Sequence, residues 1–215
     1  MDDRRWTTDD DPSLVTRHSS LVARAAALLR AGELVAFPTD TVYGVGAIAW
    51  NAAAVGKLYE AKLRALDKAI PVLLADPADV ILVAPDLPPV ALRIAQHFWP
   101  GPLTLVVPRA ERVPDAVTAG GSAVAVRVPD HDLARALIRA AGAPLATTSA
   151  NLSGQASPVT AQEVAAQLGE RIALILDGGP CPGGVPSTVL DLTQSQPRIL
   201  RPGPISLEQI LGILR

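Results

Sequence analysis

Basic side chains gather where predicted helices and strands end. One group lies at the end of a helix predicted to begin after Asn51, and its members are Lys57, Lys62, Arg64 and Lys68. These cations can converge on a polyphosphate, with Arg64 supplying a bidentate fork. Taken alone, the group is better explained as solvated charge that complements a helix dipole.

Arg127 is harder to explain as solvated charge. It interrupts residues 123–128, an apolar run that predicts a buried strand. A buried guanidinium without an anionic partner is very costly. We therefore expect Arg127 either to pair with Asp130 or Asp132 or to meet an anionic ligand at the strand end. Arg201 also follows a predicted strand, with solvated charge as its alternative.

Hydroxyl and amide side chains are dense in three loops that follow predicted strands. Such groups can orient a small polar substrate or contact a nucleotide. Turn formation explains the Pro, Asp, Asn and Gly residues of these loops as well, so both interpretations stay open. The side chains in question are Thr39, Thr41 and Tyr43 in residues 38–44, Thr147, Ser149, Asn151 and Ser153 in residues 147–154, and Ser187 in residues 178–188.

Common catalytic and metal-binding motifs are absent from the sequence. There is no P-loop, no His-Glu-x-x-His, no Cys-x-x-Cys and no Gly-x-Ser-x-Gly. The three histidines lack ligand-like spacing, so no metal site is expected, and Cys181 has no evident base and is expected to be inert. Residues 44–49 match a degenerate dinucleotide fingerprint, but they do not open a helix, which argues against nicotinamide binding.

The composition predicts a compact cytoplasmic protein. Of 215 residues, 49% are hydrophobic and 19% charged, and the net charge of −2 leaves no broad basic field for nucleic acid. A single cysteine cannot form an internal disulfide, and neither an export signal nor a membrane-spanning run is present. We expect a loose polar arm over residues 1–18 and one domain over 19–215.

Predicted helices alternate with short, almost wholly apolar strands. This pattern indicates an α/β fold with a sheet covered on both faces, and a predicted hairpin favours a mixed sheet. Ligands in such folds bind at strand ends. Helices are expected over 20–31, from 51 to about 64, after Asp76, and over 89–98, 131–141, 160–168 and 206–215; strands over 34–37, 70–75, 103–107, 123–128, 144–148, 172–176, 188–192 and 198–200.

Taken in order, several motifs resemble the threonylcarbamoyl-AMP synthase family, the YrdC or Sua5 catalytic domain. The resemblance runs from about residue 20 to about residue 207. Many members have prolines where this chain has Ala65 and Ala69. The matching motifs are Pro38-Thr39-Asp40-Thr41-Val42-Tyr43-Gly44, Lys62-Leu63-Arg64, Trp99-Pro100-Gly101-Pro102-Leu103-Thr104, Arg127-Val128-Pro129-Asp130-His131, Ser149-Ala150-Asn151, Pro186-Ser187-Thr188 and Leu200-Arg201-Pro202-Gly203.

The resemblance implies a fold and a reaction. The fold is a twisted mixed parallel and antiparallel sheet flanked by helices, with a large concave cavity, in the short form that lacks a C-terminal domain. The reaction joins L-threonine, bicarbonate and ATP, with Mg²⁺ accompanying ATP, into threonylcarbamoyl-AMP and pyrophosphate. A transferase complex would then use this product to make N6-threonylcarbamoyladenosine at position 37 of tRNAs that read ANN codons. A non-catalytic RNA-binding module is the alternative, and weak tRNA contact is compatible with either.

The resemblance also implies roles for individual residues. Cations and the Ser-x-Asn motif would serve catalysis, while hydroxyls and further cations would hold ATP and threonine. The expected catalytic residues are Lys62, Arg64, Ser149 and Asn151; the expected substrate-binding residues are Thr39, Thr41, Tyr43, Lys68, Arg127, Thr147, Ser157, Ser187 and Arg201.

Overall fold

A single mixed sheet organises the protein. The structure is a computed structural model that describes residues 12–194 and 196–214. Nine strands form the sheet in the order β7-β1-β2-β6-β3-β5-β4-β8-β9. Their bounds are β1 Val35–Phe37, β2 Gly44–Ile48, β3 Val72–Leu73, β4 Leu103–Pro108, β5 Ala123–Arg127, β6 Leu145–Ser149, β7 Leu174–Ile175, β8 Thr188–Asp191 and β9 Arg198–Arg201.

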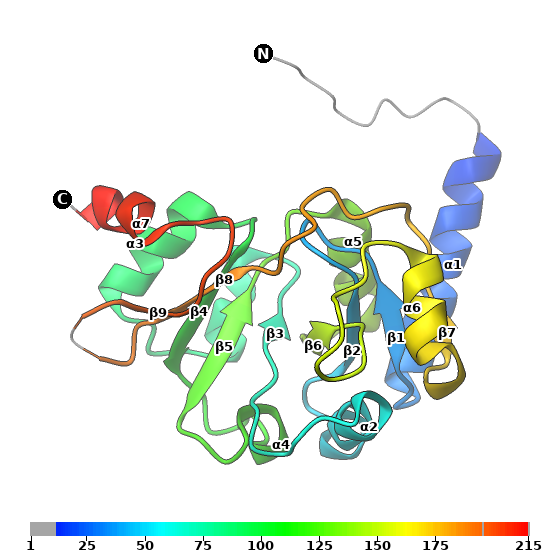
Figure 1. The fold of residues 1–215 in the computed structure, drawn as a ribbon, viewed down its shortest axis with the longest axis horizontal. Coiled ribbons are helices and arrows are strands. Elements are labelled where there is room, and N and C mark those ends of the chain that lie inside the picture. The colour runs from blue at the N-terminus through cyan, green and yellow to red at the C-terminus, as the bar shows by residue number, and fades with distance from the viewer. Residues whose placement is uncertain (1–11, 195, 215) are drawn as a thin grey trace.

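Neighbouring strands run both parallel and antiparallel, as the sequence predicted. The parallel pairs are β1 with β7, β3 with β5 and β4 with β8, and the remaining neighbours are antiparallel. β8 and β9 form the expected hairpin. The sheet is strongly twisted, so that β5 lies lengthwise in the view in which β6 is foreshortened (Figure 1).

The helices largely follow the prediction. The first one is longer than expected: it starts at Pro12 and so includes residues 12–18, which the sequence had assigned to the loose arm, while residues 1–11 of that arm lie outside the described residues. The segment after Asp76 is a 3-10 helix. The bounds are α1 Pro12–Arg30, α2 Ala52–Lys62, η1 Pro77–Leu82, α3 Pro89–Phe98, α4 Asp115–Thr118, α5 Asp132–Ala141, α6 Ala161–Leu168, η2 Gly169–Arg171 and α7 Leu207–Leu214.

Local capping explains several helix boundaries. The Asn51 side chain accepts a hydrogen bond from the Ala54 amide, 3.0 Å away, at the start of α2. Thr160 and Glu163 form the expected capping box of α6, and the Ser206 hydroxyl accepts from the Gln209 amide at 3.2 Å before α7. These short-range contacts are why the helix starts could be predicted.

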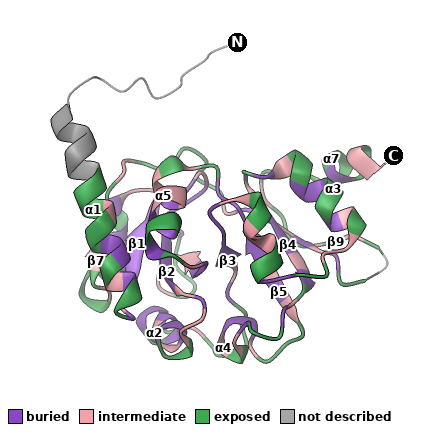
Figure 2. Ribbon diagram, turned by 180° about the vertical axis from the view of Figure 1, so that it is seen from behind, coloured by how far each residue is buried: buried purple, intermediate pink, exposed green. Residues whose placement is uncertain are grey.

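Helices cover both faces of the sheet. α1 and α5 lie side by side on the back face (Figure 2), where they bury Leu29 and Leu137 against Phe37 of β1. Ala36, the neighbour of Phe37, points the other way into the larger core, which α2, α3 and α6 also line. Apolar residues on both sides of β1 are therefore needed, which explains its continuous hydrophobic run. No described helix is both long and apolar enough to cross a membrane.

β2 is the main element that the sequence did not predict. Its glycines look like a loop, yet β2 is a central strand paired with both β1 and β6. Both Gly44 and Gly46 lie against neighbouring side chains: a Cβ on Gly44 would approach Thr147 Cγ2 to 2.7 Å, and one on Gly46 would approach Thr147 Oγ1 to 2.9 Å and Phe37 to 3.1 Å. Glycine is present because the neighbouring strands leave no space for a side chain.

The close packing of β2 yields a stability test. We expect Gly46→Ala to lower the free energy of unfolding by about 1–3 kcal/mol, since the added methyl group overpacks a buried strand. Gly56→Ala is the matched control: Gly56 lies in α2 with nothing within 4 Å of its added Cβ, so it should stabilise the helix by up to ~1 kcal/mol. Urea denaturation of both variants measures the difference, and equal effects would contradict this account of β2.

Candidate functional site

The twist of the sheet brings together residues from opposite ends of its strands. Ser149 ends β6 where that strand meets the start of β2. Arg127 ends β5 and is connected through Leu73 to Leu145, at the opposite end of β6. Nevertheless, the Arg127 guanidinium donates a hydrogen bond to Thr41 Oγ1, 3.0 Å away in the loop between β1 and β2. The candidate site forms around this contact.

Arg127 is buried and fixed by three acceptors. Only 5% of its surface is exposed. Nε donates to the Gly101 carbonyl at 2.9 Å, one terminal nitrogen donates to Thr41, and the other pairs with Asp40. Burial lowers the pKa of Arg127, and the neighbouring Asp40 carboxylate opposes that shift. The ion pair predicted with Asp130 or Asp132 is therefore replaced by one with Asp40, which the loop before β2 supplies.

The hydroxyls of the 38–44 loop mainly hold the loop itself. Thr39 Oγ1 accepts from the Thr41 and Val42 amides at 3.1 and 3.3 Å and donates to the Val42 carbonyl at 2.7 Å. Thr41 Oγ1 lies 2.9 Å from Thr39 Oγ1. Both threonines are almost fully buried, so they shape the loop as well as contributing polar groups next to Arg127.

Tyr43 ties this loop to three other segments. Its amide donates to the Pro158 carbonyl at 2.9 Å, and its carbonyl accepts from the Ala150 amide at 2.8 Å. Its hydroxyl donates to the Gly179 carbonyl at 2.8 Å. The residue is fully buried, which raises the pKa of its hydroxyl. The donor of this hydroxyl is used within the protein, and the substrate contact expected of Tyr43 stays a prediction.

Lys62 brings a buried ammonium to the end of β6. It is the last residue of α2 and only 1% exposed, and it donates to the carbonyls of Ser149 and Asn151. An ammonium has three N–H donors, so one remains. Burial, assisted by the nearby Arg64 charge, lowers the pKa of Lys62 to about 8. Within the described part of the chain, no carboxylate forms an ion pair with it.

The Ser-x-Asn motif combines a fixed amide nitrogen with one buried oxygen that has no partner among the described residues. The Asn151 side-chain nitrogen donates to the Leu152 and Gln155 carbonyls at 2.8 and 2.9 Å. Its Oδ1 is buried, and none of the described residues offers it a hydrogen bond. Ser149 and Ser157 are half-buried. Ser149 and Asn151 lie next to the Lys62 ammonium, because both of their carbonyls accept from it.

Arg201 and Ser187 belong to the β8–β9 hairpin: Arg201 ends β9, and Ser187 directly precedes β8. The Arg201 guanidinium donates to the Ser187 carbonyl at 2.8 and 3.1 Å and contacts Ser187 Oγ at 3.0 Å. Ser187 Oγ also lies 2.8 Å from Thr104 Oγ1. The pKa of Arg201 is lowered by burial and then by the positive charges of Arg127 and Arg64. Arg201 therefore lies close enough to Arg127 and Arg64 for their charges to disfavour its own.

Arg64 presents one edge of its guanidinium to its own loop. Nε donates to the Lys68 carbonyl at 3.2 Å and Nη2 to the Ala69 carbonyl at 2.9 Å. The pKa of Arg64 is lowered by burial. Lys68 contributes this backbone carbonyl, whereas its side chain is exposed. Four cations therefore converge at the site, namely Lys62, Arg64, Arg127 and Arg201, and of these Arg127 forms an ion pair with Asp40.

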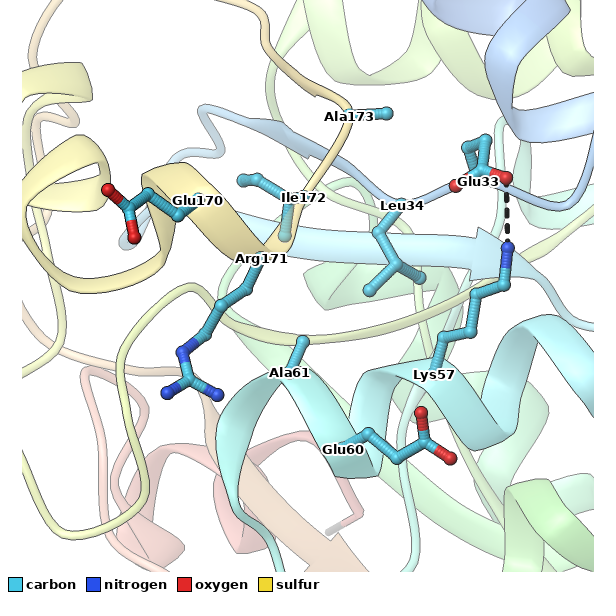
Figure 3. A pocket seen from close by; sticks show the side chains of 9 residues that line it. All are labelled: Glu33, Leu34, Lys57, Glu60, Ala61, Glu170, Arg171, Ile172 and Ala173. Atoms are coloured by element: carbon cyan, nitrogen blue, oxygen red, sulfur yellow. Dashed lines mark hydrogen bonds and ion pairs between the residues drawn. The ribbon is translucent and has the colours of Figure 1, made fainter.

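Lys57 and Thr147 have other environments. Lys57 forms an ion pair with Glu33 at 2.9 Å and lies beside a pocket of about 570 Å³ (Figure 3). This pocket lies between α2 and the segment around η2, and Lys57 lines it, but none of the expected catalytic or substrate-binding residues does. The Thr147 hydroxyl donates to the Leu145 carbonyl at 3.1 Å and packs against Gly46. The expected concave cavity over the cations remains a prediction.

Three contributors to the site were not singled out from the sequence. Asp40 and Gly101 bind Arg127, and Thr104 contacts Ser187. All three lie within motifs that carried the family resemblance, so their presence in these motifs was the available signal. The described residues include no group of three or more His, Cys, Asp or Glu side chains that could hold a metal ion.

Comparisons with known proteins give a consistent result. The family model Sua5_yciO_yrdC, described as telomere recombination, matches residues 27–203. The threonylcarbamoyl-AMP synthase of Bacillus subtilis is 48% identical over 215 residues, and that of Pyrococcus abyssi is 46% identical over 190 residues. These matches cover 100% and 88% of this chain but 62% and 56% of the two relatives. The chain thus spans less than two thirds of the length of either protein.

Solved structures support the same assignment. P. abyssi Sua5 complexed with L-threonine superposes with a TM-score of 0.88 at 44% sequence identity, covering 90% of this chain and 57% of that one. Escherichia coli YciO gives a TM-score of 0.82 at 25% identity, covering 89% and 93%. The family model covers most of the chain, and the relatives exceed 40% identity. The chain therefore belongs to the Sua5, YciO and YrdC family.

Proposed function

We propose that the protein makes threonylcarbamoyl-AMP and pyrophosphate from L-threonine, bicarbonate and ATP. The observation that carries this proposal is the convergence of Lys62, Arg64, Arg127 and Arg201 beside a loop rich in hydroxyls, where only Arg127 is paired with a carboxylate, that of Asp40, among the described residues. Such a cluster is suited to a polyanionic reactant. Relatives named threonylcarbamoyl-AMP synthase, and a related structure in complex with L-threonine, support these reactants.

The reaction needs orientation and fixed positive charge. The threonine amine attacks bicarbonate to give a carbamate and water, and a carbamate oxygen then attacks the α-phosphorus of ATP and expels pyrophosphate. Negative charge develops on phosphoryl oxygens during the second step. The remaining N–H of Lys62 and the outer edge of Arg64 can bind these oxygens, and Arg201 extends the positive surface. Preorganised donors of this kind stabilise the transition state.

Polar groups around the cations fit the smaller reactants. The free Oδ1 of Asn151 can accept a hydrogen bond from an amine or a ribose hydroxyl, and Ser149 can donate to a carboxylate. Thr39, Thr41 and Thr147 would bound the threonine side chain, while Ser157 and Ser187 would contact the nucleotide. Arg127 keeps two N–H donors beyond its three protein contacts, which can meet an anionic group.

Magnesium would enter as the ATP complex. Mg²⁺ keeps several waters and is commonly held by substrate phosphates, so a site of this type needs few protein carboxylates. The residues around the cations fit magnesium that is held by ATP phosphates and water, because they offer mainly hydroxyl, amide and carbonyl groups. The cations themselves would neutralise those phosphate oxygens that the metal does not reach.

The product would pass to a transferase that modifies adenosine 37 of tRNA, in the cytoplasm. The RNA-binding alternative is less well supported, because Lys62 and Arg127 are 1% and 5% exposed and cannot form a surface for RNA phosphates. Any direct tRNA contact is therefore expected to be weak.

Pyrophosphate release tests the proposed reaction directly. We expect release that requires threonine, bicarbonate and ATP together, with threonylcarbamoyl-AMP identified by mass spectrometry. Omission of threonine is the internal control, since an ATP-hydrolysing contaminant would release phosphate without it. Absence of threonine-dependent release over a range of magnesium concentrations would refute the proposal.

Arg64→Lys should lower kcat/KM at least about tenfold, because a point charge replaces a planar fork. Arg112→Lys is the matched control, since Arg112 stacks over Trp50 with 4.2 Å to the ring centroid and belongs to none of the site segments. Its activity should stay near that of the wild type. Full activity of Arg64→Lys in the same assay would exclude the proposed role.

The lowered pKa of Lys62 predicts a pH dependence of ATP binding. Lysine is charged below its pKa, so the binding-competent ammonium is lost as pH rises through about 8. If only the charged form binds, ATP affinity should fall about tenfold between pH 7 and pH 9, in proportion to the competent fraction. Calorimetry in buffers of different ionisation enthalpy should also detect proton uptake on binding near pH 8. In Lys62→Met, both effects should disappear; their persistence would assign them to another group.

A further inference from the structure

A glycine-rich segment crosses the loop that holds Arg127. Residues 177–184, here called the strap, connect β7 toward β8 and run beside the loop after β1, as the orange and blue segments show in Figure 1. A Cβ on Gly183 would lie 2.5 Å from the Asp40 carbonyl oxygen and 3.1 Å from Thr41 Cα. The Gly184 amide donates to the Thr41 carbonyl at 2.8 Å. The strap therefore packs backbone to backbone on this loop.

The N-terminal part of the strap also packs closely against neighbouring segments. A Cβ on Gly178 would approach Leu133 Cδ2 to 2.5 Å and Pro38 Cγ to 2.9 Å. The Cys181 amide donates to the Val159 carbonyl at 2.8 Å. These contacts join the strap to the start of α5 and to the loop before α6. Glycine allows this approach because any larger residue would displace the strap.

Tyr43 is the side chain that fastens the strap. Its hydroxyl donates to the Gly179 carbonyl at 2.8 Å and lies 3.3 Å from Asp177 Oδ1, which in turn accepts from the Gly179 amide at 3.0 Å. The ring is fully buried, so the hydroxyl has no competing water. A hydrogen bond of this kind favours one position of an otherwise glycine-rich segment.

Two buried polar atoms without partners lie in the segments that the strap contacts. Asp40 Oδ2 and His131 Nδ1 are both buried, and among the described residues neither has a hydrogen-bond partner. His131 precedes α5, two residues before the Leu133 side chain that Gly178 contacts. Buried polar atoms without a hydrogen-bond partner are costly. A small ligand group with an N–H or O–H donor would satisfy Asp40 Oδ2, yet only 5% of Arg127 and 7% of Cys181 are exposed.

We propose that Tyr43 is a positioning residue whose hydroxyl holds the strap closed over Asp40 and Arg127, so that a small ligand reaches them only when the strap lifts. The inference deepens the proposed function and rests on it for the identity of the ligand, a reactant that carries an amine or hydroxyl donor. The hydrogen bond from the Tyr43 hydroxyl to the strap, here called the latch, does not depend on the identity of the ligand.

Cys181 is a built-in reporter of strap opening. It is the one cysteine of the chain and faces inward, with burial raising the pKa of its thiol to about 11. A thiol reagent reacts with the exposed thiolate, so labelling in the native protein measures how often the strap lifts. We expect Tyr43→Phe to label roughly fivefold faster than the wild type in the absence of any ligand, the factor that corresponds to one net hydrogen bond.

Tyr59→Phe is the matched control. Tyr59 is also buried, and its hydroxyl donates to the Ala116 carbonyl at 2.9 Å, away from the strap. It should label at the wild-type rate, with thermal denaturation verifying that both variants are folded. Equal labelling of Tyr43→Phe and wild type, or equal acceleration in Tyr59→Phe, would overturn the latch.

Ligand protection tests access separately. Saturating L-threonine with ATP should slow Cys181 labelling of the wild type several-fold, because a ligand bound to Asp40 and Arg127 would hold the strap closed over it. Unchanged labelling in protein that releases pyrophosphate would overturn the access proposal. Failure of pyrophosphate release with a normal Tyr43→Phe effect would refute the proposed reaction and leave the latch intact.

Discussion

The buried pair of Arg127 and Asp40 is the contact on which the site depends. It joins the end of β5 to the loop after β1, two parts of the sheet that are separated by three strands. A buried charge without a partner is strongly destabilising, so neither residue can be placed without the other. The twist of the sheet brings them within reach, and the 99–104 loop is held in place as well because Arg127 also donates to Gly101.

Around this pair, the protein concentrates positive charge without neutralising it. Lys62 is held by the carbonyls of Ser149 and Asn151, and Arg201 by the carbonyl and hydroxyl of Ser187. Carbonyl oxygens fix the direction of a cation while leaving its net charge available. The lowered pKa values of Lys62 and Arg201 reflect burial and the repulsion of neighbouring arginines. A bound polyanion would favour the charged forms of Lys62 and Arg201 and so raise their pKa values again. The electrostatics of the fold are in this way connected with the proposed reaction.

Glycines and one tyrosine adjust the spacing of the segments around the cations. Gly44 and Gly46 let β2 lie against Thr147, and Gly203 lets the last loop approach the Ser187 backbone, where a Cβ would come within 2.6 Å of the Ser187 carbonyl carbon. Tyr43 uses its amide, carbonyl and hydroxyl to connect three further segments. Backbone contacts of this kind are insensitive to side-chain type, and they position the polar groups of several loops at once.

The sequence by itself determined the mixed sheet covered on both faces, most helix starts and the family. Apolar periodicity, capping residues and ordered motifs are local signals, and each can be recognised without knowing what lies opposite. The same local signals explain why β2 was missed, because glycine in a central strand is required only by the residues of neighbouring strands, which periodicity does not reveal.

Only the tertiary structure decided which predicted residues share a site. Lys57 and Lys62 lie five residues apart, about 140° around a helix, so one pairs with Glu33 at the surface and the other enters the core. Arg127 takes Asp40 as its partner, and the Tyr43 hydroxyl binds the strap. These outcomes depend on the twist of the sheet and on contacts between residues more than 80 positions apart in the sequence, which local sequence patterns cannot specify.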